Sequence, residues 1–344
     1  MKGFLKNGGL FLLLLAMTAY VIGRELEPGQ IRAASESTDR RYLLLGLGAM
    51  AVFVINEGYN IVRMLRSFGC KVTPWQGIRY AMTGFFFSAV TPSASGGQPM
   101  QLYAMHRDGV DLSKGTLALL GELLSFQLVS TALAAAGFLY HRHVIVEAAG
   151  SGWYLFLAGM GLNLIVAAVL LLVLLRPGAA CSLIRLAVRI LSLFSRTRAE
   201  RAESFLNVQL ADYLNSAKTF RRNPLLIAKT LGTTLVQLTD MYSVTYLVYR
   251  AMGFEDWGFL QVTALQAVLS VSVSALPLPG AVGVSEGGFL LLFRAFFPGQ
   301  AIGSAMILSR TVSFYLPVAV TGIFTAIRTA AGKNIDKQDQ KVYP

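Results

Sequence analysis

Several charged side chains lie within long apolar segments of this sequence, where they are energetically unfavourable and therefore informative. These residues are Glu57, Glu122, Asp240, Glu286, Arg294 and Arg310. A charge at the centre of a lipid bilayer costs about 2.5–3.5 kcal/mol on insertion scales, so such side chains should face the protein interior or water. They either bind a charged ligand or form buried ion pairs that hold helices together, for instance Arg310 with Asp240 or Glu286.

Two segments join serine, glycine and proline to strongly apolar flanks. The first reads TPSASGGQP at residues 91–99, and the second reads PLPGAVGVSEGG at residues 277–288. Prolines and glycines so close together end a helix. Serine and glycine at the start of a short helix favour an anion such as phosphate, and Ser285 is placed to cap a half-helix beginning near Glu286. The alternative is that the glycines only permit close packing of helices.

The composition places these residues in a membrane protein. The chain has 344 residues, of which 54% are hydrophobic and 14% charged, and its mean hydropathy is +0.56. A soluble globular protein carries about 25% charged residues, so an ordinary cytosolic enzyme and a disordered chain are both excluded. The net charge of +12 comes from basic stretches between apolar segments, which favours anionic lipid over nucleic acid as a partner. Two cysteines, Cys70 and Cys181, form neither a disulfide framework nor a metal motif.

Eight apolar segments organise the chain. They are residues 8–23, 42–62, 75–90, 113–140, 152–175, 225–249, 258–297 and 301–327. A complete span needs about 20 apolar residues, so several of them can cross a bilayer alone. The first is interpreted as a retained anchor and not as a cleaved signal peptide, because no convincing cleavage site follows it. Irregular backbone within lipid must be buried in protein or line a watery cavity, so the two broken segments must be placed by topology.

The distribution of basic residues decides that topology. If all eight segments spanned the bilayer from a cytoplasmic N-terminus, residues 176–222, with nine basic and three acidic side chains, would lie outside. That placement contradicts the positive-inside rule. If residues 75–105 instead enter from the cytoplasm and return there, the basic stretch lies inside. A second hairpin at residues 258–297, entering from outside, makes both termini cytoplasmic. The prediction is an all-α polytopic membrane protein with six spanning helices and two re-entrant broken-helix hairpins.

The same topology divides the chain into two inverted repeats. Residues 1–150 and 151–332 each follow the order span, span, broken hairpin, span, with opposite orientation, and residues 333–344 form a cytoplasmic tail. Transporters with this arrangement bring their broken helices together near the middle of the membrane. Residues 181–196 have the pattern of a basic amphipathic helix on the inner leaflet, or of a soluble linker helix packed on the bundle. Its basic residues are Arg185, Arg189 and Arg196.

Catalytic motifs occur only as chance matches. GVSEG at residues 283–287 fits GxSxG, but a serine hydrolase needs a strand-turn-helix context and a later histidine. HRDGVD at residues 106–111 fits the HxxxxD pattern of glycerolipid acyltransferases without an accompanying substrate-binding motif. His141 and His143 have no third ligand near them in the sequence, and there is no P-loop. We therefore expect no catalytic residue, no metal and no cofactor.

The two broken segments resemble the signature stretches of a known family. TPSASGGQP followed by Tyr103 and Arg107, together with PLPGAVGVSEGG, is similar to the lysylphosphatidylglycerol synthase transmembrane-region family, and the likeness covers about residues 8–331. That family includes the N-terminal flippase domain of the bacterial multiple peptide resistance factor. The resemblance implies a flippase-like transporter in the bacterial cytoplasmic membrane. It would move lysyl-phosphatidylglycerol, an aminoacylated phosphatidylglycerol, from the inner to the outer leaflet and so contribute to resistance to cationic antimicrobial peptides. The soluble aminoacyl-transfer domain of the full-length factor is not found in this sequence, so we expect a transporter and not an enzyme.

Under this interpretation the polar residues take distinct roles. Phosphate would be bound by Ser93, Ser95, Gln98 and Ser285, with the backbone around Gly96, Gly97, Pro279 and Gly280. The cationic amino-acid group would be received by Glu122, Asp240 and Glu286. Arg294 and Arg310 would balance charge or touch phosphate, and Arg107 completes the lipid-binding set. Arg185, Arg189 and Arg196 would recruit anionic lipid of the inner leaflet.

Alternatives remain open at this point. The lipid could be a polyprenyl-phosphate-linked sugar or another lipid. The chain could instead be a membrane partner that docks a separate synthase on residues 176–222, or a membrane enzyme of lipid modification. The spacing from Gly283 to Gly287 is compatible with packing within or between chains, which leaves a homo-oligomer open.

Overall fold

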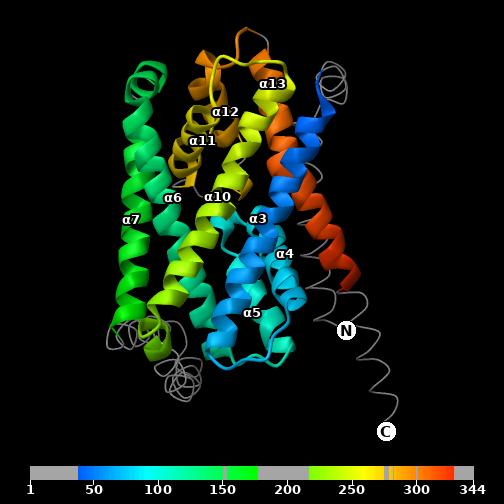
Figure 1. Cartoon of the computed structure of the whole chain (residues 1–344), viewed down its shortest axis with the longest axis vertical. Coiled ribbons are helices and arrows are strands. Elements are labelled where there is room, and N and C mark those ends of the chain that lie inside the picture. Colours follow the sequence, from blue (N-terminus) through cyan, green and yellow to red (C-terminus); the bar gives the residue numbers. More distant parts are fainter. Residues whose placement is uncertain are drawn as a thin grey trace, which may run out of the picture.

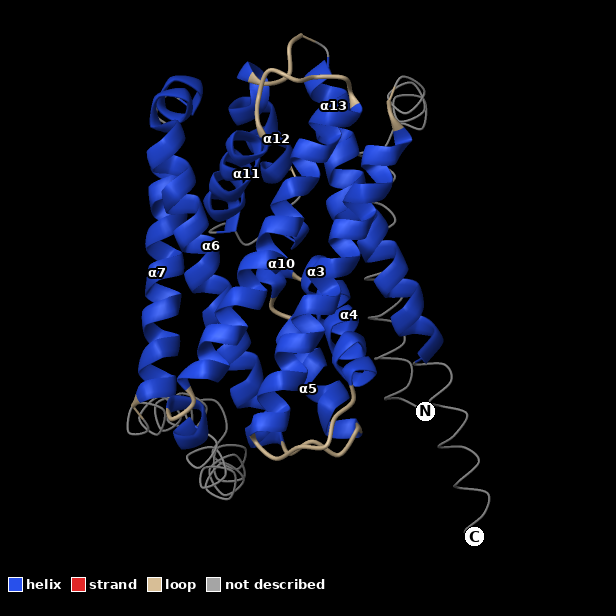
Figure 2. Cartoon of the chain, in the orientation of Figure 1, coloured by secondary structure: helices blue, strands red, loops and turns tan. Residues whose placement is uncertain are grey.

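The computed structural model describes residues 38–149, 153–176, 217–274, 279–281, 283–299 and 301–328. Within these ranges the chain is helical and contains no strand, as Figure 2 shows. The predicted all-α membrane fold is confirmed to that extent. The predicted segment 8–23, the amphipathic segment with Arg185, Arg189 and Arg196, and the tail 333–344 lie outside the described residues.

Nine α-helices are defined in these ranges. The longer ones are α3 (Arg40–Ser67), α6 (Leu112–Ala149), α7 (Trp153–Leu175) and α10 (Pro224–Ala251). The shorter ones are α4 (Pro74–Val90), α5 (Gly97–Arg107), α11 (Phe259–Ser274), α12 (Val284–Leu292) and α13 (Ala301–Arg310). Short turns of 3-10 helix are η1 (Pro92–Ala94), η3 (Pro279–Ala281) and η4 (Phe293–Ala295). A π-helical turn, η5 (Thr311–Tyr315), follows α13, and the helix then continues to Arg328.

Four helices in the described part are long and apolar enough to cross a membrane. They are Arg40–Ser67, Leu112–Glu147, Trp153–Leu174 and Ala301–Arg328. They coincide with spans that the sequence predicts. Helix α10 was also predicted to span and runs beside α3 through the centre of the molecule (Figure 1), but polar side chains such as Gln237 and Asp240 lower its hydropathy.

The starts of the helices follow from local sequence signals. The side chain of Asp39 accepts a hydrogen bond from Arg41 N at 2.9 Å and caps α3. Thr73 and Gln76 form a capping box at the start of α4, with Pro74 in the first turn. These side chains satisfy N–H groups that the first helical turn leaves without partners.

The two pairs of short helices occupy opposite ends of the molecule. At one end, α4 and α5 pack on each other, and α4 also packs on α3 while α5 packs on α6. At the other end, α11 and α12 pack on each other and against α6 (Figure 1). The turns that break each pair, η1 and η3, contact each other. Segments nearly 190 residues apart in sequence therefore meet, at 92–94 and 279–281.

Close packing of α3 on α4 depends on small residues. A Cβ atom added to Gly58 would lie 2.7 Å from the backbone N of Ile78, and Gly77 faces Gly58 across the same contact. Glycine at such a position lets two backbones approach each other, as is common between helices in membranes. The apolar core of the described residues forms three clusters. The two larger ones contain Tyr249 and Phe293, and Met64 and Met105, respectively, and the third consists of Phe86, Val90 and Val318.

Candidate functional site

Arg310 and Glu286 form a buried ion pair where η3, α12 and η5 meet. The Arg310 Nε atom lies 2.6 Å from Glu286 Oε1, and the two side chains are 14% and 6% exposed. Arg310 Nη2 also donates to the backbone oxygen of Gly280 at 3.0 Å. Of the two partners expected for Arg310, the structure therefore selects Glu286. One guanidinium fixes both the turn η3 and the helix that follows it.

Glu286 also occupies the start of its own helix. Its Oε2 atom accepts a hydrogen bond from Gly283 N at 2.6 Å. Helix α12 begins at Val284 with Gly283 as its N-cap, so Ser285 lies inside the first turn. The expectation that Ser285 caps this helix is wrong, because the helix begins before Ser285 and Gly283 takes the N-cap position, with its N–H group bound by Glu286.

Two aromatic residues of the π-helical turn enclose the guanidinium. The Arg310 Cζ atom lies 4.4 Å from the ring centroid of Phe314 and 5.7 Å from that of Tyr315. Tyr315 is buried, and its hydroxyl lies 3.5 Å from Glu286 Oε1. Such contacts stabilise a cation away from water, and π-helical turns often occur at functional sites. Gly280, with a φ of +58°, allows this approach because a Cβ there would lie 3.0 Å from a Phe314 ring atom.

The turns η1 and η3 hold non-glycine residues in the left-handed region. The φ angles are 51° at Ser93, 54° at Ala94 and 51° at Ala281. Such conformations cost on the order of 1–3 kcal/mol each and persist where the surrounding structure imposes them, often at functional sites. The contact between η1 and η3 is that surrounding structure here.

The candidate phosphate ligands of the first half gather around η1 and the start of α5. Ser93 and Ser95 are exposed, and Gln98 is half-buried. The N-cap of α5 is Gly96, and no side chain caps the first N–H groups at Gly97 and Gln98. Thr91 Oγ1 instead accepts from Gly96 N at 2.9 Å and fixes the turn. The helix start therefore presents backbone donors beside exposed hydroxyl groups, which is an arrangement that suits an anion.

A second polar cluster joins α3, α5 and α6. Gln101 Nε2 donates to Glu57 Oε1 at 2.7 Å, and Glu122 lies on α6, which packs on both α3 and α5. Gln101 is 3% exposed and Glu122 is 8% exposed. Sequence reasoning singled out both glutamates but missed Gln101, as it missed Tyr315. The signal for Gln101 was an amide between the apolar residues Met100 and Leu102 of α5.

Comparison with known proteins gives the context for this geometry. The sequence profile described as "Lysylphosphatidylglycerol synthase TM region" matches residues 8–321. The chain belongs to this family. It is also similar to a protein named "UPF0104 membrane protein" from Archaeoglobus fulgidus, with 22% identity over 272 residues, which cover 77% of this chain and 81% of that protein. Membership of a lysylphosphatidylglycerol synthase transmembrane-region family indicates a membrane protein with a lipid-related role.

Not every predicted site residue of this family member lies at the broken turns. Asp240 is half-buried in α10, and its Oδ2 atom has no hydrogen-bond partner within the described residues. Arg294 is exposed in η4, beyond the C-terminal end of α12. Arg107 is exposed in the last turn of α5, about 15 Å along the helix from its start at Gly97. Pro279 belongs to η3, next to Gly280. The structure thus brings Gly280, Glu286 and Arg310 together and leaves the two other arginines at the ends.

The C-terminal end of α5 is bound to the first two turns of α4 through Asp108. Asp108 Oδ2 accepts from Arg79 Nη2 at 2.6 Å, from the Tyr80 hydroxyl at 2.7 Å and from Gln76 Nε2 at 3.3 Å. Asp108 is therefore a structural anchor of the α4–α5 pair.

An apolar cavity of about 180 Å³ opens beside the second broken pair. It lies between α7, α11 and α12, and Phe156, Leu269, Gly287 and Leu291 are among its lining residues. Gly287 is adjacent to Glu286, so apolar surface and the buried ion pair lie on successive residues of α12.

Proposed function

We propose that the protein is a phospholipid transporter that moves an aminoacylated phosphatidylglycerol, such as lysyl-phosphatidylglycerol, from the inner to the outer leaflet of a bacterial cytoplasmic membrane. In this proposal α4–α5 and α11–α12 are re-entrant hairpins of two inverted repeats. The observation that carries it is the contact of η1 with η3 beside the buried pair of Glu286 and Arg310. Broken helices that meet near the midplane form the substrate site in inverted-repeat transporters.

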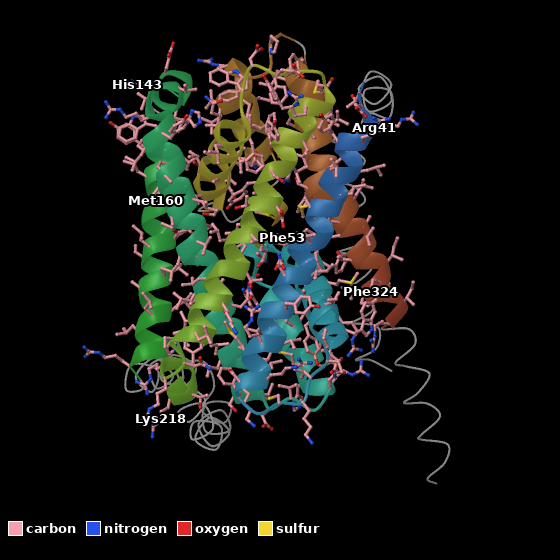
Figure 3. All side chains as sticks on the ribbon, in the orientation of Figure 1. Arg41, Phe53, His143, Met160, Lys218 and Phe324 are labelled. Atoms are coloured by element: carbon pink, nitrogen blue, oxygen red, sulfur yellow. The ribbon has the colours of Figure 1, made fainter. Side chains whose placement is uncertain are left out.

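The charge distribution supports an orientation. Figure 3 shows Lys218 at one end of the molecule and Arg41 and His143 at the other. Basic residues at or near the end with Lys218 are Arg66, Lys71, Lys114, Arg176, Arg221, Arg222, Lys229 and Arg328. Acidic residues in the short α5–α6 connection there are Asp108 and Asp111. The opposite end mixes Arg40, Arg41, Arg142 and Arg250 with Asp39, Glu147, Glu255 and Asp256. By the positive-inside rule, the end with Lys218 faces the cytoplasm.

The ion pair can bind a headgroup that carries both a negative and a positive charge by exchanging partners with it. Phosphate takes the place of Glu286 on Arg310, and the ammonium group of the amino acid takes the place of Arg310 on Glu286. Each buried charge then keeps an opposite partner, which avoids the several kcal/mol that an unpaired buried ion costs. The backbone donors at Gly97 and Gln98, from the facing hairpin, add hydrogen bonds to phosphate.

Apolar surface for the lipid tails lies next to this site. The cavity between α7, α11 and α12 contains Gly287, one residue from Glu286. An acyl chain in that cavity would keep the headgroup near the ion pair while the tail remains in an apolar environment. Phospholipid is therefore a better match to the site than a soluble anion.

The proposed test measures lipid movement by the purified chain in vesicles. Fluorescent lysyl-phosphatidylglycerol and phosphatidylglycerol are placed in the inner leaflet, and an impermeant reductant scores their arrival outside. Glu286→Gln and Arg310→Gln should slow movement of the lysyl lipid more than tenfold, and Glu286→Gln should reduce the preference for it over phosphatidylglycerol. Glu255→Gln, which alters the exposed pair with Arg250, is the matched control and should move lipid at the wild-type rate.

The outcomes separate the alternatives. If wild-type protein moves neither lipid, the proposed function is wrong. If it moves polyprenyl-phosphate carriers in the same assay but neither glycerophospholipid, the other-lipid alternative is correct. If the wild type is active and neither Glu286→Gln nor Arg310→Gln slows it, the transport site lies elsewhere.

We further propose that the chain does not itself transfer aminoacyl groups. Within the ranges that the structure describes, no group of three or more His, Cys, Asp or Glu could hold a metal ion. The charged groups of the two interior sites described above are an ion pair and two carboxylates, which can bind charge. Incubation of the purified chain with lysyl-tRNA and phosphatidylglycerol should therefore give no lysyl-phosphatidylglycerol, and its formation would overturn this point. Transport by the chain alone would also exclude a purely docking role for a separate synthase.

A further inference from the structure

The polar cluster on α3, α5 and α6 contains acidic side chains without a paired cation in the part of the chain that the structure describes, unlike the neutral pair of Glu286 and Arg310. Glu57 accepts one hydrogen bond, from Gln101 at 2.7 Å. Glu122 is more than nine-tenths buried and has no hydrogen bond or ion pair within the described residues. Helix α6, which carries Glu122, packs on both α3 and α5, which carry Glu57 and Gln101. Among the described residues the cluster is thus two acids and one amide, and no basic side chain is paired with either acid.

The amide of Gln101 is held in place by packing. A Cβ atom added to Gly84 of α4 would lie 2.8 Å from Gln101 Cγ, so only glycine at this position leaves room for the side chain. The Gln101 side chain passes over α4 and directs its donor to Glu57. This donor stabilises a negative charge on Glu57, while Glu122 has no comparable donor.

Basic groups on the surrounding elements are engaged elsewhere or exposed. Arg63 of α3 donates to Asn60 and Thr233 at 3.0 Å, and Arg310 is bound to Glu286. Arg79 and Lys114 are in salt bridges with Asp108 and Asp111, and His106, Arg107, Lys229 and Arg294 are exposed. The other basic side chains of the packed helices lie toward the ends of α3, α6 and α10, and they are Arg40, Arg41, Arg66, His141, Arg142, His143 and Arg250. The other titratable groups on these elements are Tyr42 and Tyr59 of α3, Tyr80 of α4, Tyr103 of α5, Tyr140 and Glu147 of α6, Tyr154 of α7, Asp240, Tyr242, Tyr246 and Tyr249 of α10, Glu286 of α12 and Tyr315 of η5, and α11 has none. None of these residues supplies a cation to Glu57 or Glu122.

Among the cations that could neutralise Glu57 and Glu122, a proton needs the fewest ligands. Two neighbouring carboxylates in a low-dielectric interior cannot both ionise without a large penalty, so they titrate as a pair that shares one proton. A divalent metal ion prefers six or more oxygen ligands, and the described residues contain no cluster of three or more His, Cys, Asp or Glu side chains. The donor set therefore suits a proton better than a metal ion.

The position of Gln101 connects this pair to the lipid site. Gln101 lies one helical turn after Gly97, where α5 begins beside η1. Figure 3 places Phe53 near the middle of the molecule, and Glu57 follows one turn later on α3. Any shift of α5 that accompanies headgroup binding at its N-terminus moves Gln101 relative to Glu57 and changes how strongly the pair holds a proton.

We infer that Glu57 and Glu122 form a proton-binding site, with Gln101 as its positioning residue, and that proton binding there drives lipid movement. The coupling part of this inference rests on the proposed function. A proton from water on one side of the membrane binds to one carboxylate oxygen and neutralises one of two negative charges. It leaves as hydronium on the other side after the hairpin has moved, so that one proton crosses for each lipid.

The first experiment detects the proton without any transport. Infrared difference spectra of the purified protein, between low and high pH, report the C=O stretch of a protonated carboxyl group. The wild-type band should disappear in Glu57→Gln and in Glu122→Gln and should persist in Glu286→Gln. Gln101→Leu keeps both acids and should move the midpoint of the band to higher pH, because the donor that favours the ionised form is gone. A band that survives in both Glu57→Gln and Glu122→Gln overturns the proton site.

The second experiment tests coupling in vesicles with an imposed pH gradient. For one proton per lipid, a gradient of one pH unit should change the steady-state ratio of lipid between leaflets by about tenfold in the wild type. Glu122→Gln should give a ratio that does not respond to the gradient, and Glu255→Gln should respond as the wild type does. An equal response in Glu122→Gln overturns the coupling. Absence of any lipid movement in the wild type refutes the proposed function, while the infrared result still decides the proton site.

Discussion

The buried pair of Arg310 and Glu286 should contribute strongly and non-additively to stability. Glu286→Gln keeps the shape of the side chain but removes the charge that Arg310 contacts at 2.6 Å, and it weakens the bond to Gly283 N. With side-chain exposures of 6% and 14%, little water can replace the lost partner. Removing one member of such a pair costs about 3–5 kcal/mol, because the other charge stays buried. Removing both members with Glu286→Gln and Arg310→Met should cost less than the sum, by about 2 kcal/mol or more.

A double-mutant cycle measures this coupling. The free energy of unfolding is determined for the wild type, both single variants and the double variant by titrating denaturing detergent into mixed micelles. The exposed pair of Arg250 and Glu255, with Glu255 74% exposed, is the control and should couple by no more than about 1 kcal/mol. If the Arg310–Glu286 cycle is additive within about 0.5 kcal/mol, the pair does not hold η3 and α12 together and the reasoning is refuted.

Three further predictions test the packing and the termini of the hairpins. Gly58→Leu should destabilise the protein by about 1–3 kcal/mol or more through overpacking against α4, whereas Gly48→Ala, with open space around it, should change the melting temperature little. Burial raises the pKa of the Cys70 thiol, so in a variant without the other cysteine its maleimide labelling at pH 7 should be slower than in denatured protein, and the difference should shrink as pH rises. Asp108→Asn removes the carboxylate that binds Arg79 and should increase proteolysis or hydrogen exchange at the α4–α5 ends, and unchanged protection there would contradict the anchor role.

The long helices and the break points could be predicted because they depend on local sequence. Apolar stretches of about 20 residues specify the helices α3, α6 and α7 without reference to their neighbours. Proline and glycine at 91–99 and 277–288 end helices through their own backbone geometry. The structure accordingly breaks at η1 and η3, within the predicted segments.

The contacts of the site could not be predicted in the same way. Asp240 and Glu286 were equal candidates for Arg310, since both are acids in apolar segments, and the choice depends on how α12 packs on the last helix. The π-helical turn after Arg310 and the approach of Phe314 to Gly280 likewise exist only in the folded chain. Ser285 was a reasonable cap by composition, but the helix begins at Val284, and the pattern alone does not show that Gly283 takes the N-cap position.

The two interior polar sites differ in net charge, and this difference assigns them different tasks. Arg310 with Glu286 is neutral, so it can exchange partners with a headgroup that carries both a phosphate and an ammonium group without leaving a charge unpaired. Phosphatidylglycerol lacks the ammonium group and would leave Glu286 uncompensated, which is a physical basis for preferring the aminoacylated lipid. Within the described residues, Glu57 and Glu122 form an acidic site without a paired cation, so in our proposal its charge changes when a proton binds. The proposed transport needs both properties, since the first site would recognise the lipid and the second would supply direction.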